Sequence, residues 1–483
     1  MSIRPRTKIV ATIGPASRDP ETLRRLIREG VDVARLNFSH GDPDTHRQNV
    51  RRIRAAAEEV GRPVAIQVDL QGPKLRVGEV VESGITLEEG EQATLVTDDE
   101  VGRSATAIPV QNEQLPQIVE PGDSILLADG TLELEVISTT PREVHCRVRV
   151  GGVLTSNKGI NLPAVAADLP NITEKDRHDL AHALEWEIDW IALSFVRSAE
   201  GIYELKELIR ELLPQGKSVP VMAKIEKPQA LDNLDAIIEA ADAVMVARGD
   251  LGIEIPPEEV PMAQKRIIEA CNEAGIPVVT ATQMLESMIQ NPRPTRAEAS
   301  DVANAILDGT DAVMLSGETT IGSYPVESVR TMRRIIEEVE ATRPRPSARP
   351  FRPSKEEVRR SIANAVGRAA REAARDLNAA ALITPTVSGY TARIMSRYRP
   401  QACIVAVTPD PRVQRRLMIH WGVIPLLAPR ADNSDEMIKH AVDAARAQDL
   451  VKEGDTLVIT AGAARSQPGT TNLMHIYVVG QDV

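Results

Sequence analysis

The sequence predicts an α/β protein: a TIM (β/α)8 barrel with an inserted small β-barrel domain and a C-terminal open α/β domain. Short runs rich in β-branched and other apolar residues alternate with helical patterns, which is typical of βαβ units and a parallel sheet. Eight such runs occur, three before and five after a segment with a different pattern, and eight parallel strands close a TIM barrel. The length of 483 residues suits about three domains, at roughly 150 residues for each.

The eight predicted barrel strands are residues 8–13, 33–37, 64–69, 190–195, 221–225, 243–247, 277–281 and 311–315. The stretches between them are predicted to be helices, for example residues 20–29 and 261–273. We expect the first strand to pair with the eighth, because that contact closes the barrel. A six-stranded open, doubly wound sheet is the alternative, and it leaves two strands unexplained.

An all-β pattern interrupts the barrel after its third strand. Alternating strands such as residues 133–137 and 143–150 are separated there by Glu-Glu-Gly, Pro-Gly-Asp and Ala-Asp-Gly turns. We therefore predict a barrel built from residues 1–72 and 161–341, with a β lid domain inserted at residues 73–160.

A third domain is predicted at residues 354–483, after a helix over 325–340 and a Pro- and Arg-rich linker at 342–353. Helices at 361–378 and 434–448 accompany five strands, a pattern that predicts an open α/β sheet. The five strands are residues 381–384, 403–407, 422–427, 455–460 and 476–479.

Composition excludes several classes of partner. The 57 Lys plus Arg face 69 Asp plus Glu, and the net charge of -12 argues against nucleic acid or an anionic membrane surface. Only 3 Trp, 5 Tyr and 3 Phe are present, which disfavours recognition by stacking. The 3 cysteines form no C-x-x-C pair, and the N-terminal residues show no apolar signal segment, so we expect a cytoplasmic protein.

Polar side chains gather where the predicted barrel strands end. They are Arg35, Asn37, Ser39, His40, Asp69, Ser194, Arg197, Lys224, Glu226, Arg248, Asp250, Thr282, Ser316 and Glu318. In TIM barrels this face holds the active site, and charges at buried strand ends are costly unless they serve a site or pair with each other. A structural ring of ion pairs is the alternative. The mixture of carboxylates, cations and hydroxyls favours a site for a metal ion and an anionic substrate.

Glu226 and Asp250 end consecutive strands and are the predicted ligands of Mg²⁺ (or Mn²⁺), since Mg²⁺ prefers one or two carboxylates with water and substrate oxygens. Lys224 lies two residues before Glu226, so both side chains point into the barrel mouth. A lysine there suits a phosphate clamp, a Schiff base or a structural partner of the carboxylates. With Arg35 and the backbone N–H groups of residues 247–250 as anion donors, the set indicates phosphoryl or enolate chemistry.

Long motifs at these positions resemble the pyruvate kinase family, and specifically its bacterial type. They are TKIVATIGPAS, ARLNFSHG, DLQGPKLR, NKGINLP, AKIEK, VARGDLG, ATQMLESM, RPTRAE and MLSGETTIGSYP, in the order and spacing of the family over essentially the whole chain. The resemblance implies Mg²⁺-dependent transfer of the phosphoryl group of phosphoenolpyruvate to ADP, giving pyruvate and ATP as the final step of glycolysis.

The resemblance also implies roles for single residues. Lys224 would stabilise the transferring phosphoryl group, and Arg35 would contact phosphate. The amides of Gly249 and Asp250, with Thr282, would hold the substrate carboxylate. Thr282, Ser316 and Glu318 would belong to the region that protonates the enolate. The implied nucleotide contacts are Asn37, Phe38, Ser39, His40, Arg76 and, on the lid, Lys158.

Lys74 distinguishes two branches of this family. Many members bind K⁺ through residues that match Asn37, Ser39, Asp69 and Leu70, with a Glu where this chain has Lys74. A lysine there matches the branch that works without K⁺, because its ammonium group supplies the same charge. A unit charge pair at 4 Å is worth about 4 kcal/mol at an effective dielectric near 20. The alternative is that Lys74 merely faces solvent.

The loop from Thr386 to Thr391 joins a strand to a helix, and such a turn can cradle phosphate or simply cap the helix. The family binds phosphorylated allosteric effectors there, which implies contacts from Thr386, Ser388, Gly389 and Thr391. Val387 is apolar where fructose-bisphosphate-activated forms have a basic residue, so a sugar monophosphate and AMP both stay open. The family also implies a homotetramer built through the barrel and C-terminal domains.

Two other functions fit the residues less well. A Mg²⁺-dependent carbon–carbon lyase would use a similar barrel, but the lid and nucleotide-contacting residues argue against it. A catalytically inactive sensor of phosphorylated metabolites would have lost Lys224, Glu226, Asp250 or Thr282, and all four are present.

Overall fold

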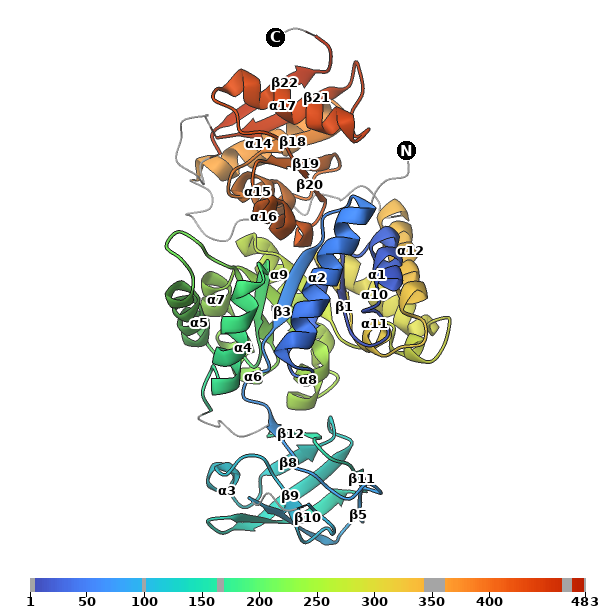
Figure 1. Ribbon diagram of the computed structural model, residues 1–483, viewed down its shortest axis with the longest axis vertical. Helices are drawn as coiled ribbons and strands as arrows, with labels where there is room; N and C mark the ends of the chain where they lie inside the picture. The colour runs from blue at the N-terminus through green and yellow to red at the C-terminus, as the bar shows by residue number, and fades with distance from the viewer. Residues whose placement is uncertain (1–4, 98–100, 163–168, 343–360, 463–470, 482–483) are drawn as a thin grey trace.

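The computed structural model describes residues 5–97, 101–162, 169–342, 361–462 and 471–481. Three bodies follow one another along its long axis: a β domain at one end, the barrel in the middle and the C-terminal domain at the other end (Figure 1). No helix among the described residues is long and apolar enough to cross a membrane.

The central body is a closed barrel of eight parallel strands in the order β1-β17-β16-β15-β14-β13-β3-β2. The strands are β1 Lys8–Thr12, β2 Val33–Asn37, β3 Ala65–Asp69, β13 Trp190–Leu193, β14 Val221–Ile225, β15 Ala243–Ala247, β16 Val278–Ala281 and β17 Ala312–Leu315. The predicted closure is confirmed, because β1 pairs with β17 from Lys8 opposite Ala312 onwards. The open-sheet alternative is wrong. Nearly every strand residue is buried, since side chains fill the interior and helices cover the outside.

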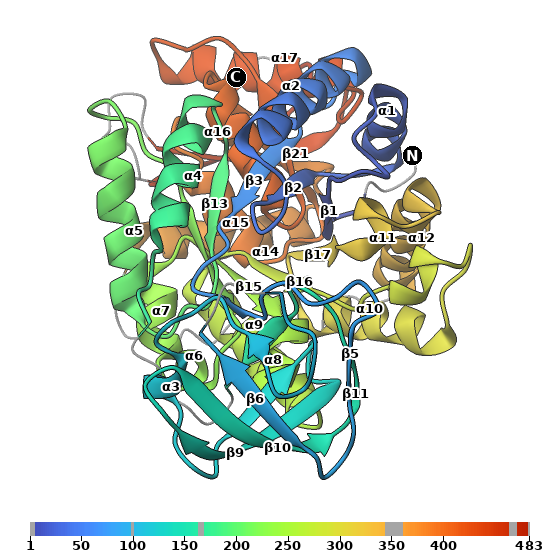
Figure 2. The same ribbon diagram turned by 60° about the horizontal axis from the view of Figure 1, so that its bottom comes forward.

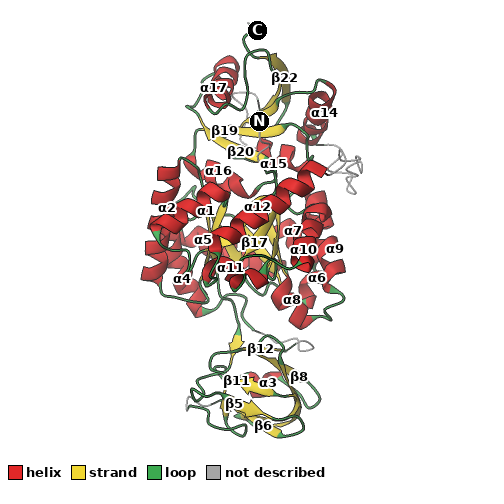
Figure 3. Ribbon diagram, turned by 90° about the vertical axis from the view of Figure 1, so that its right-hand side faces the viewer, coloured by secondary structure: helices red, strands yellow, loops and turns green. Residues whose placement is uncertain are grey.

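Helices surround the barrel, as Figure 3 shows. They are α1 Pro20–Glu29, α2 Pro43–Val60, α4 Glu174–Glu185, α5 Ala199–Leu212, α6 Pro228–Asp232, α7 Leu234–Ala240, α8 Arg248–Glu254, α9 Val260–Ala274, α10 Arg296–Asp308, α11 Gly317–Thr320 and α12 Pro325–Thr342, with the 3-10 helix η1 Glu286–Ile289. Their starts follow local sequence signals: Asp19 and Asp42 cap α1 and α2, and capping boxes begin α4 and α10.

The inserted domain contains a seven-stranded sheet in the order β4-β12-β8-β9-β10-β6-β7 and a two-stranded sheet β11-β5. The elements are β4 Leu75–Arg76, β5 Ile85–Leu87, β6 Gln92–Val96, β7 Ile108–Pro109, α3 Leu115–Ile118, β8 Ser124–Leu127, β9 Leu132–Thr139, β10 Glu143–Val150, β11 Gly152–Leu154 and β12 Gly159–Asn161. The two strands predicted in this region are β9 and β10, which pair antiparallel around a core of their own.

The C-terminal domain is an open sheet in the order β20-β19-β18-β21-β22, with β22 antiparallel to β21. Its elements are α14 Ile362–Asp376, β18 Ala381–Pro385, α15 Tyr390–Arg397, β19 Cys403–Thr408, α16 Pro411–Arg416, η2 Leu417–Ile419, β20 Val423–Leu427, α17 Ser434–Ala447, β21 Thr456–Ala461 and β22 Leu473–Val478. The predicted fold class is therefore confirmed. The predicted linker lies outside the described residues from 343 onwards, and the domain limits stay predictions.

Candidate active site

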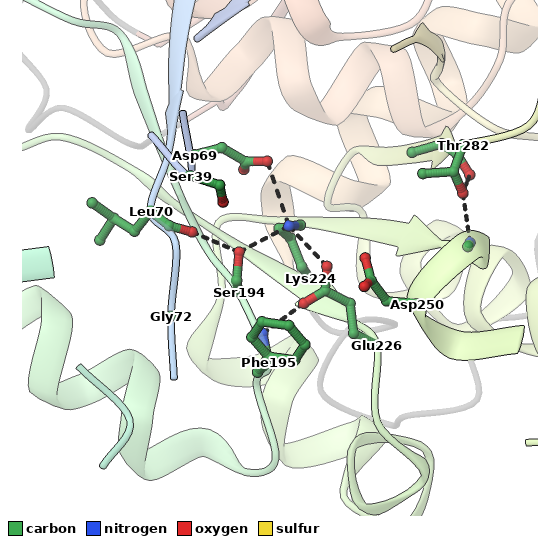
Figure 4. A network of polar contacts seen from close by, with 12 residues as sticks. Ser39, Asp69, Leu70, Gly72, Ser194, Phe195, Lys224, Glu226, Asp250 and Thr282 are labelled. Atoms are coloured by element: carbon green, nitrogen blue, oxygen red, sulfur yellow. Dashed lines mark hydrogen bonds and ion pairs between the residues drawn. The ribbon is translucent and has the colours of Figure 1, made fainter. Parts of the chain in front are cut away.

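The candidate site lies at the C-terminal ends of the barrel strands, at the end of the barrel that carries the β domain (Figure 2). A cavity of about 610 Å³ opens there, and its lining includes Lys74, Arg248, Gly249 and Asp250. Asp129 of the β domain also lines it, so the inserted domain forms part of the wall. Figure 4 shows the polar network around Lys224, next to Asp250 of this lining.

Lys224 is the centre of this network. Its Nζ lies 2.8 Å from Glu226 Oε1, 3.4 Å from Asp69 Oδ2 and 2.8 Å from Ser194 Oγ, to which it donates a hydrogen bond. Ser194 in turn donates to the carbonyl of Leu70 at 2.6 Å. Burial alone would lower the pKa of Lys224, but the charges of Asp69 and Glu226 raise it above its ordinary value. The side chain is therefore a fixed, buried cation.

Asp69 joins this lysine to Arg35. Arg35 Nε donates to Asp69 Oδ2 at 2.7 Å, a second guanidinium nitrogen also contacts that oxygen, and Nη1 donates to Thr12 Oγ1 at 3.1 Å. Burial alone would raise the pKa of Asp69, yet Arg35 and Lys224 hold it below its ordinary value. Asp69 thus orients two cations toward the barrel mouth.

Glu226 and Asp250 supply the carboxylates. Glu226 is fully buried and accepts the backbone N–H of Phe195 at 2.7 Å through Oε2. Burial raises the pKa of Glu226, and the charge of Asp250 adds to that effect against the opposing charge of Lys224. Two carboxylates whose charges repel each other in a buried site form a donor set that fits a divalent cation. The predicted pair of metal ligands is thus brought together.

Lys74 reaches Asp250, one of these two carboxylates, from the segment that leads into the β domain. Its Nζ lies 3.2 Å from Asp250 Oδ1 and 5.9 Å from the centre of the Phe195 ring. Burial alone would raise the pKa of Asp250, but the charges of Lys74 and Lys224 hold it below its ordinary value. Lys74 therefore points into the site, and the alternative that it merely faces solvent is not observed.

Thr282 follows β16 with a strained backbone. Its φ of +70° lies in the left-handed region, which is costly for a β-branched residue and is found where surrounding contacts hold it. Thr282 Oγ1 accepts the Gly249 N–H at 2.6 Å, and the Thr282 carbonyl accepts Arg248 Nη2 at 2.7 Å. The hydroxyl is thus held beside the start of α8, close to the Asp250 backbone.

Ser316 and Glu318 follow β17. Glu318 is buried and accepts the N–H groups of Ser316 at 2.7 Å and Leu285 at 2.9 Å. Burial raises the pKa of Glu318, so its neutral form is favoured relative to an exposed Glu. Ser316 Oγ is buried and has no hydrogen-bond partner among the described residues, which leaves this hydroxyl available to a ligand.

The residues that are predicted to contact the nucleotide have different surroundings. Burial and the neighbouring positive charges of Arg76 and Lys74 lower the pKa of His40. The Phe38 ring is buried and stacked on His46 at 4.3 Å between ring centroids. Lys158 is exposed on the β domain, where its carbonyl accepts the Val77 N–H at 2.9 Å.

The other three residues of this set lie near the barrel mouth and in the β domain. Ser39 N–H donates to Asn37 Oδ1 at 3.2 Å, and Arg76 Nη1 donates to the Asn157 carbonyl at 3.0 Å. Asn37 is the last residue of β2 and Ser39 follows it, whereas Arg76 lies on β4. The set is therefore divided between two bodies of the molecule.

The predicted effector loop lies in the C-terminal domain, between β18 and α15. Thr386 Oγ1 accepts the Gly389 N–H at 2.9 Å, and Thr391 Oγ1 lies 2.9 Å from Thr471 Oγ1. Ser388 is exposed, and Gly389 has a φ of +84° at the start of α15. The two threonine hydroxyls are thus engaged within the domain.

Sequence reasoning missed several residues that hold the site. The Phe195 N–H is presented to Glu226 by a φ of +56°, and Lys175 Nζ donates to the Phe38 carbonyl at 2.8 Å. Lys227 Nζ lies 2.6 Å from Glu254 Oε1, which also accepts Asn161 Nδ2 at 2.8 Å, so the neck of the β domain is tied to the barrel. Its position as the last residue of a predicted strand, 190–195, was the available signal for Phe195, whereas β13 ends at Leu193.

A barrel enzyme with a buried lysine, paired carboxylates and clustered cations at its mouth is suited to phosphoryl transfer. Comparisons with known proteins identify the family. Residues 4–329 match the model of the pyruvate kinase barrel domain, and residues 364–477 match that of the pyruvate kinase alpha/beta domain. The chain belongs to the pyruvate kinase family and is a phosphotransferase.

Individual relatives agree with this assignment. Pyruvate kinase 2 of Synechocystis sp. is 48% identical over 98% of this chain and 79% of its own length. The pyruvate kinase of Geobacillus stearothermophilus is 47% identical over 98% of this chain and 80% of its own. The crystal structure of a pyruvate kinase from Cryptosporidium parvum superposes with a TM-score of 0.90 at 39% identity, covering 98% of this chain and 96% of that one.

Proposed function

We propose that this protein transfers the phosphoryl group of phosphoenolpyruvate to ADP and releases pyruvate and ATP, the final step of glycolysis. The carrying observation is Lys224, a buried ammonium held between Asp69 and Glu226 at the barrel mouth. A fixed cation in a water-poor site stabilises charge that develops on a transferring phosphoryl group more than it stabilises the ground state. Glu226 and Asp250 would hold Mg²⁺ (or Mn²⁺), which when bound neutralises charge on substrate oxygens.

The remaining residues take complementary parts in this proposal. Arg35 contacts the phosphoryl group while Asp69 keeps its guanidinium in place. The Gly249 N–H, which donates to Thr282 Oγ1 at 2.6 Å without substrate, turns with the Asp250 amide and the Thr282 hydroxyl to the substrate carboxylate when substrate binds. An oxygen of ADP attacks phosphorus, the bond from phosphorus to the enol oxygen breaks, and the enolate takes a proton at its terminal carbon. Thr282, Ser316 and Glu318 form the route for that proton, because Ser316 Oγ is free to donate and burial favours neutral Glu318.

The proposal also includes the binding of the nucleotide, the β domain as a lid, and the assembly and regulation of the enzyme. ADP is bound by Asn37, the Phe38 backbone, Ser39, His40, Arg76 and Lys158. The β domain acts as a lid that excludes water, which would otherwise hydrolyse the phosphoryl group. Catalysis needs no K⁺, since the ammonium of Lys74 lies 3.2 Å from Asp250 Oδ1. The enzyme works as a cytoplasmic homotetramer that a phosphorylated effector regulates through the loop of Thr386, Ser388, Gly389 and Thr391.

ATP formation from phosphoenolpyruvate and ADP, measured in a coupled assay, tests this proposal. Purified protein should form ATP only with Mg²⁺ or Mn²⁺, and Lys224→Met should lower kcat by on the order of 10² to 10³. Lys265→Met removes a half-exposed lysine that pairs with Asp308 on the outside of the barrel, and it should leave kcat unchanged. Near-normal turnover of a folded Lys224→Met variant, or no ATP formation by the unchanged protein, would refute the assignment.

A further inference from the structure

Arg248, the first residue of α8, holds the backbone segment that carries Thr282. Its guanidinium donates to the carbonyls of Ala281 at 3.3 Å, Thr282 at 2.7 Å and Gln283 at 3.4 Å, and Nη2 lies 2.8 Å from Met284 Sδ. One side chain therefore binds four consecutive residues, from the end of β16 into the segment that follows it. The Arg248 side chain is only 10% exposed, so water competes little for these hydrogen bonds.

This segment needs support because its backbone is strained. Thr282 has a φ of +70° and Gln283 has a φ of +53°, so two consecutive residues with side chains occupy the left-handed region. That conformation is uncommon for residues other than glycine, is least favourable for a β-branched residue, and persists where surrounding contacts hold it. Hydrogen bonds from a charged donor to the carbonyls of both residues are contacts of this kind. The guanidinium of Arg248 thus favours the strained conformation over a relaxed one.

The Thr282 hydroxyl is connected to Arg248 in a second way. Thr282 Oγ1 donates to the Ala281 carbonyl at 2.5 Å and accepts the N–H of Gly249, the residue after Arg248, at 2.6 Å. The Ala281 carbonyl also accepts Arg248 Nε, so the hydroxyl and the guanidinium share one acceptor. A change at Arg248 therefore reaches the Thr282 hydroxyl both through its backbone and through this shared carbonyl.

An ion pair that merely joins helices is the simpler role for Arg248. Its Nη1 lies 2.7 Å from Asp301 of α10 and 3.4 Å from Gln264 Oε1 of α9. These contacts use only Nη1, whereas Nε and Nη2 are directed to the segment after β16. The planar fork of a guanidinium can bind both sets of acceptors at once, because its nitrogens point in fixed and different directions. Asp301 thus orients the guanidinium, and the other two nitrogens hold the strained backbone.

We propose that Arg248 is a positioning residue, which holds Thr282 in the left-handed conformation that presents its hydroxyl to the substrate. Arg248 acts on the reaction only through Thr282 and does not itself touch the substrate. This role rests on the proposed function, in which Thr282 binds the substrate carboxylate and belongs to the route of the proton to the enolate. Misplacing a reacting group by about 1 Å costs about 10²-fold in rate, so kcat is the quantity that should respond.

Steady-state kinetics of ATP formation by Arg248→Lys tests this role. We expect kcat to fall by about 10²-fold, because the single nitrogen of a lysine cannot bind Asp301 and the carbonyls together. The KM for ADP should change by less than about twofold, since the residues proposed to bind ADP lie on other elements of the molecule.

Arg54→Lys is the matched control. Arg54 also donates to two carbonyls, those of Val64 at 2.8 Å and Glu187 at 3.0 Å, and it also pairs with an aspartate, Asp189. These contacts lie where β3 and β13 begin, at the end of the barrel opposite the active site. Arg54→Lys should therefore lower stability and leave kcat unchanged.

A double-mutant cycle with Thr282→Ala distinguishes positioning from a general structural role. If Arg248 acts only through Thr282, adding Arg248→Lys to Thr282→Ala should lower kcat further by less than about twofold. Circular dichroism and thermal unfolding establish which variants fold. If Arg248→Lys does not fold, Asp301→Asn takes its place, because it loosens the guanidinium without removing it. That variant should lower kcat in the same direction, and again only while Thr282 is present.

The outcomes separate the role of Arg248 from the proposed function. No ATP formation by the unchanged protein would refute both. ATP formation by the unchanged protein, together with a normal kcat in folded Arg248→Lys or in the Asp301→Asn variant that replaces it, would overturn only the role of Arg248. A further loss of about 10²-fold when Arg248→Lys is added to Thr282→Ala would overturn it as well, because the two effects would then be independent.

Discussion

Lys74 and Lys227 approach the ring of Phe195 at the same distance, 5.9 Å from Nζ to ring centroid, but they serve different acids. Lys74 pairs with Asp250, whereas Lys227 pairs with buried Glu254. A cation is needed beside each acid, because an unpaired buried carboxylate is costly. Each lysine therefore neutralises a different acid. Only Lys74 supplies, beside Asp250, the positive charge that a bound monovalent cation would otherwise provide.

Lys74 should make catalysis independent of K⁺. We expect ATP formation to persist when tetramethylammonium replaces K⁺, and Lys74→Glu to lower activity strongly and to make the remainder depend on K⁺. The reason is the loss of a positive charge that is worth about 4 kcal/mol against a unit charge at 4 Å and an effective dielectric near 20. Lys227→Gln is the matched control and should create no K⁺ dependence. Strict dependence of the unchanged enzyme on K⁺ would contradict the prediction.

At the scale of elements, four aspartates fasten the N-terminal edge of the barrel. Asp32, Asp189, Asp242 and Asp311 each precede a strand and accept a backbone N–H of the neighbouring strand, at 2.9, 2.8, 2.9 and 2.9 Å. The strands that follow them are β2, β13, β15 and β17, which are alternate strands of the closed barrel. The same register at every second strand gives the edge a repeating set of charged hydrogen bonds.

At the opposite edge, the start of α10 fastens the loop that carries Thr282. Glu298 accepts Ser287 N–H at 2.7 Å, Ser287 Oγ at 2.6 Å and Thr295 N–H at 2.7 Å. Burial alone would raise the pKa of Glu298, but the hydrogen bonds from Ser287 and Thr295 hold it below its ordinary value of 4.5. Ionised Glu298 therefore joins the start of α10 to the preceding 3-10 helix, η1.

Glu298→Gln should lower the free energy of unfolding by about 1 to 2 kcal/mol at pH 7, the usual cost of a lost capping interaction. Because the pKa of Glu298 is lowered by folding, its contribution is complete above about pH 4.5 and is lost as the pH falls through the lowered value. Urea unfolding should be measured at several pH values. The difference in the free energy of unfolding between the variant and the unchanged protein should become smaller below pH 4.5. Glu286→Gln, at an exposed carboxylate of η1, is the control, and a difference that persists in acid would contradict the assignment.

The sequence predicts these elements better than it predicts their contacts. All eight barrel strands were located, because residues buried on both faces produce continuous apolar runs. That Lys224, Glu226 and Asp250 lie together was predicted by the same route, since strand ends determine where side chains emerge, and their roles stay predictions. The Phe195 N–H, the partner of Lys74 and the cavity between the barrel and the C-terminal domain were not predictable, because each depends on a local backbone conformation or on packing between segments distant in sequence.

At the scale of the whole molecule, two of these four aspartates, Asp189 and Asp311, also bind the C-terminal domain. Asp189 is fully buried and pairs with Arg54 of the barrel at 2.7 Å and with Arg415 of the C-terminal domain at 2.9 Å. Asp311 pairs with Arg399 at 3.0 Å in the same way. Arg399 also lies over the Trp421 ring, 4.8 Å from its centroid. The contact between the barrel and the C-terminal domain is thus an ionic interface.

Asp189→Asn should separate the unfolding of the C-terminal domain from that of the barrel. The substitution keeps an acceptor for the Ile66 N–H but leaves Arg54 and Arg415 without their charge partner, at a cost of about 3 to 5 kcal/mol for a broken buried pair. Scanning calorimetry should then show an earlier transition for the C-terminal domain. Asp32→Asn is the matched control. Asp32 occupies the same register, but it pairs with Arg62 of the barrel domain and not with the C-terminal domain. The control should lower stability without dividing the transition. Equal division in both variants, or in neither, would mean that the Asp189 charge does not hold the two bodies together.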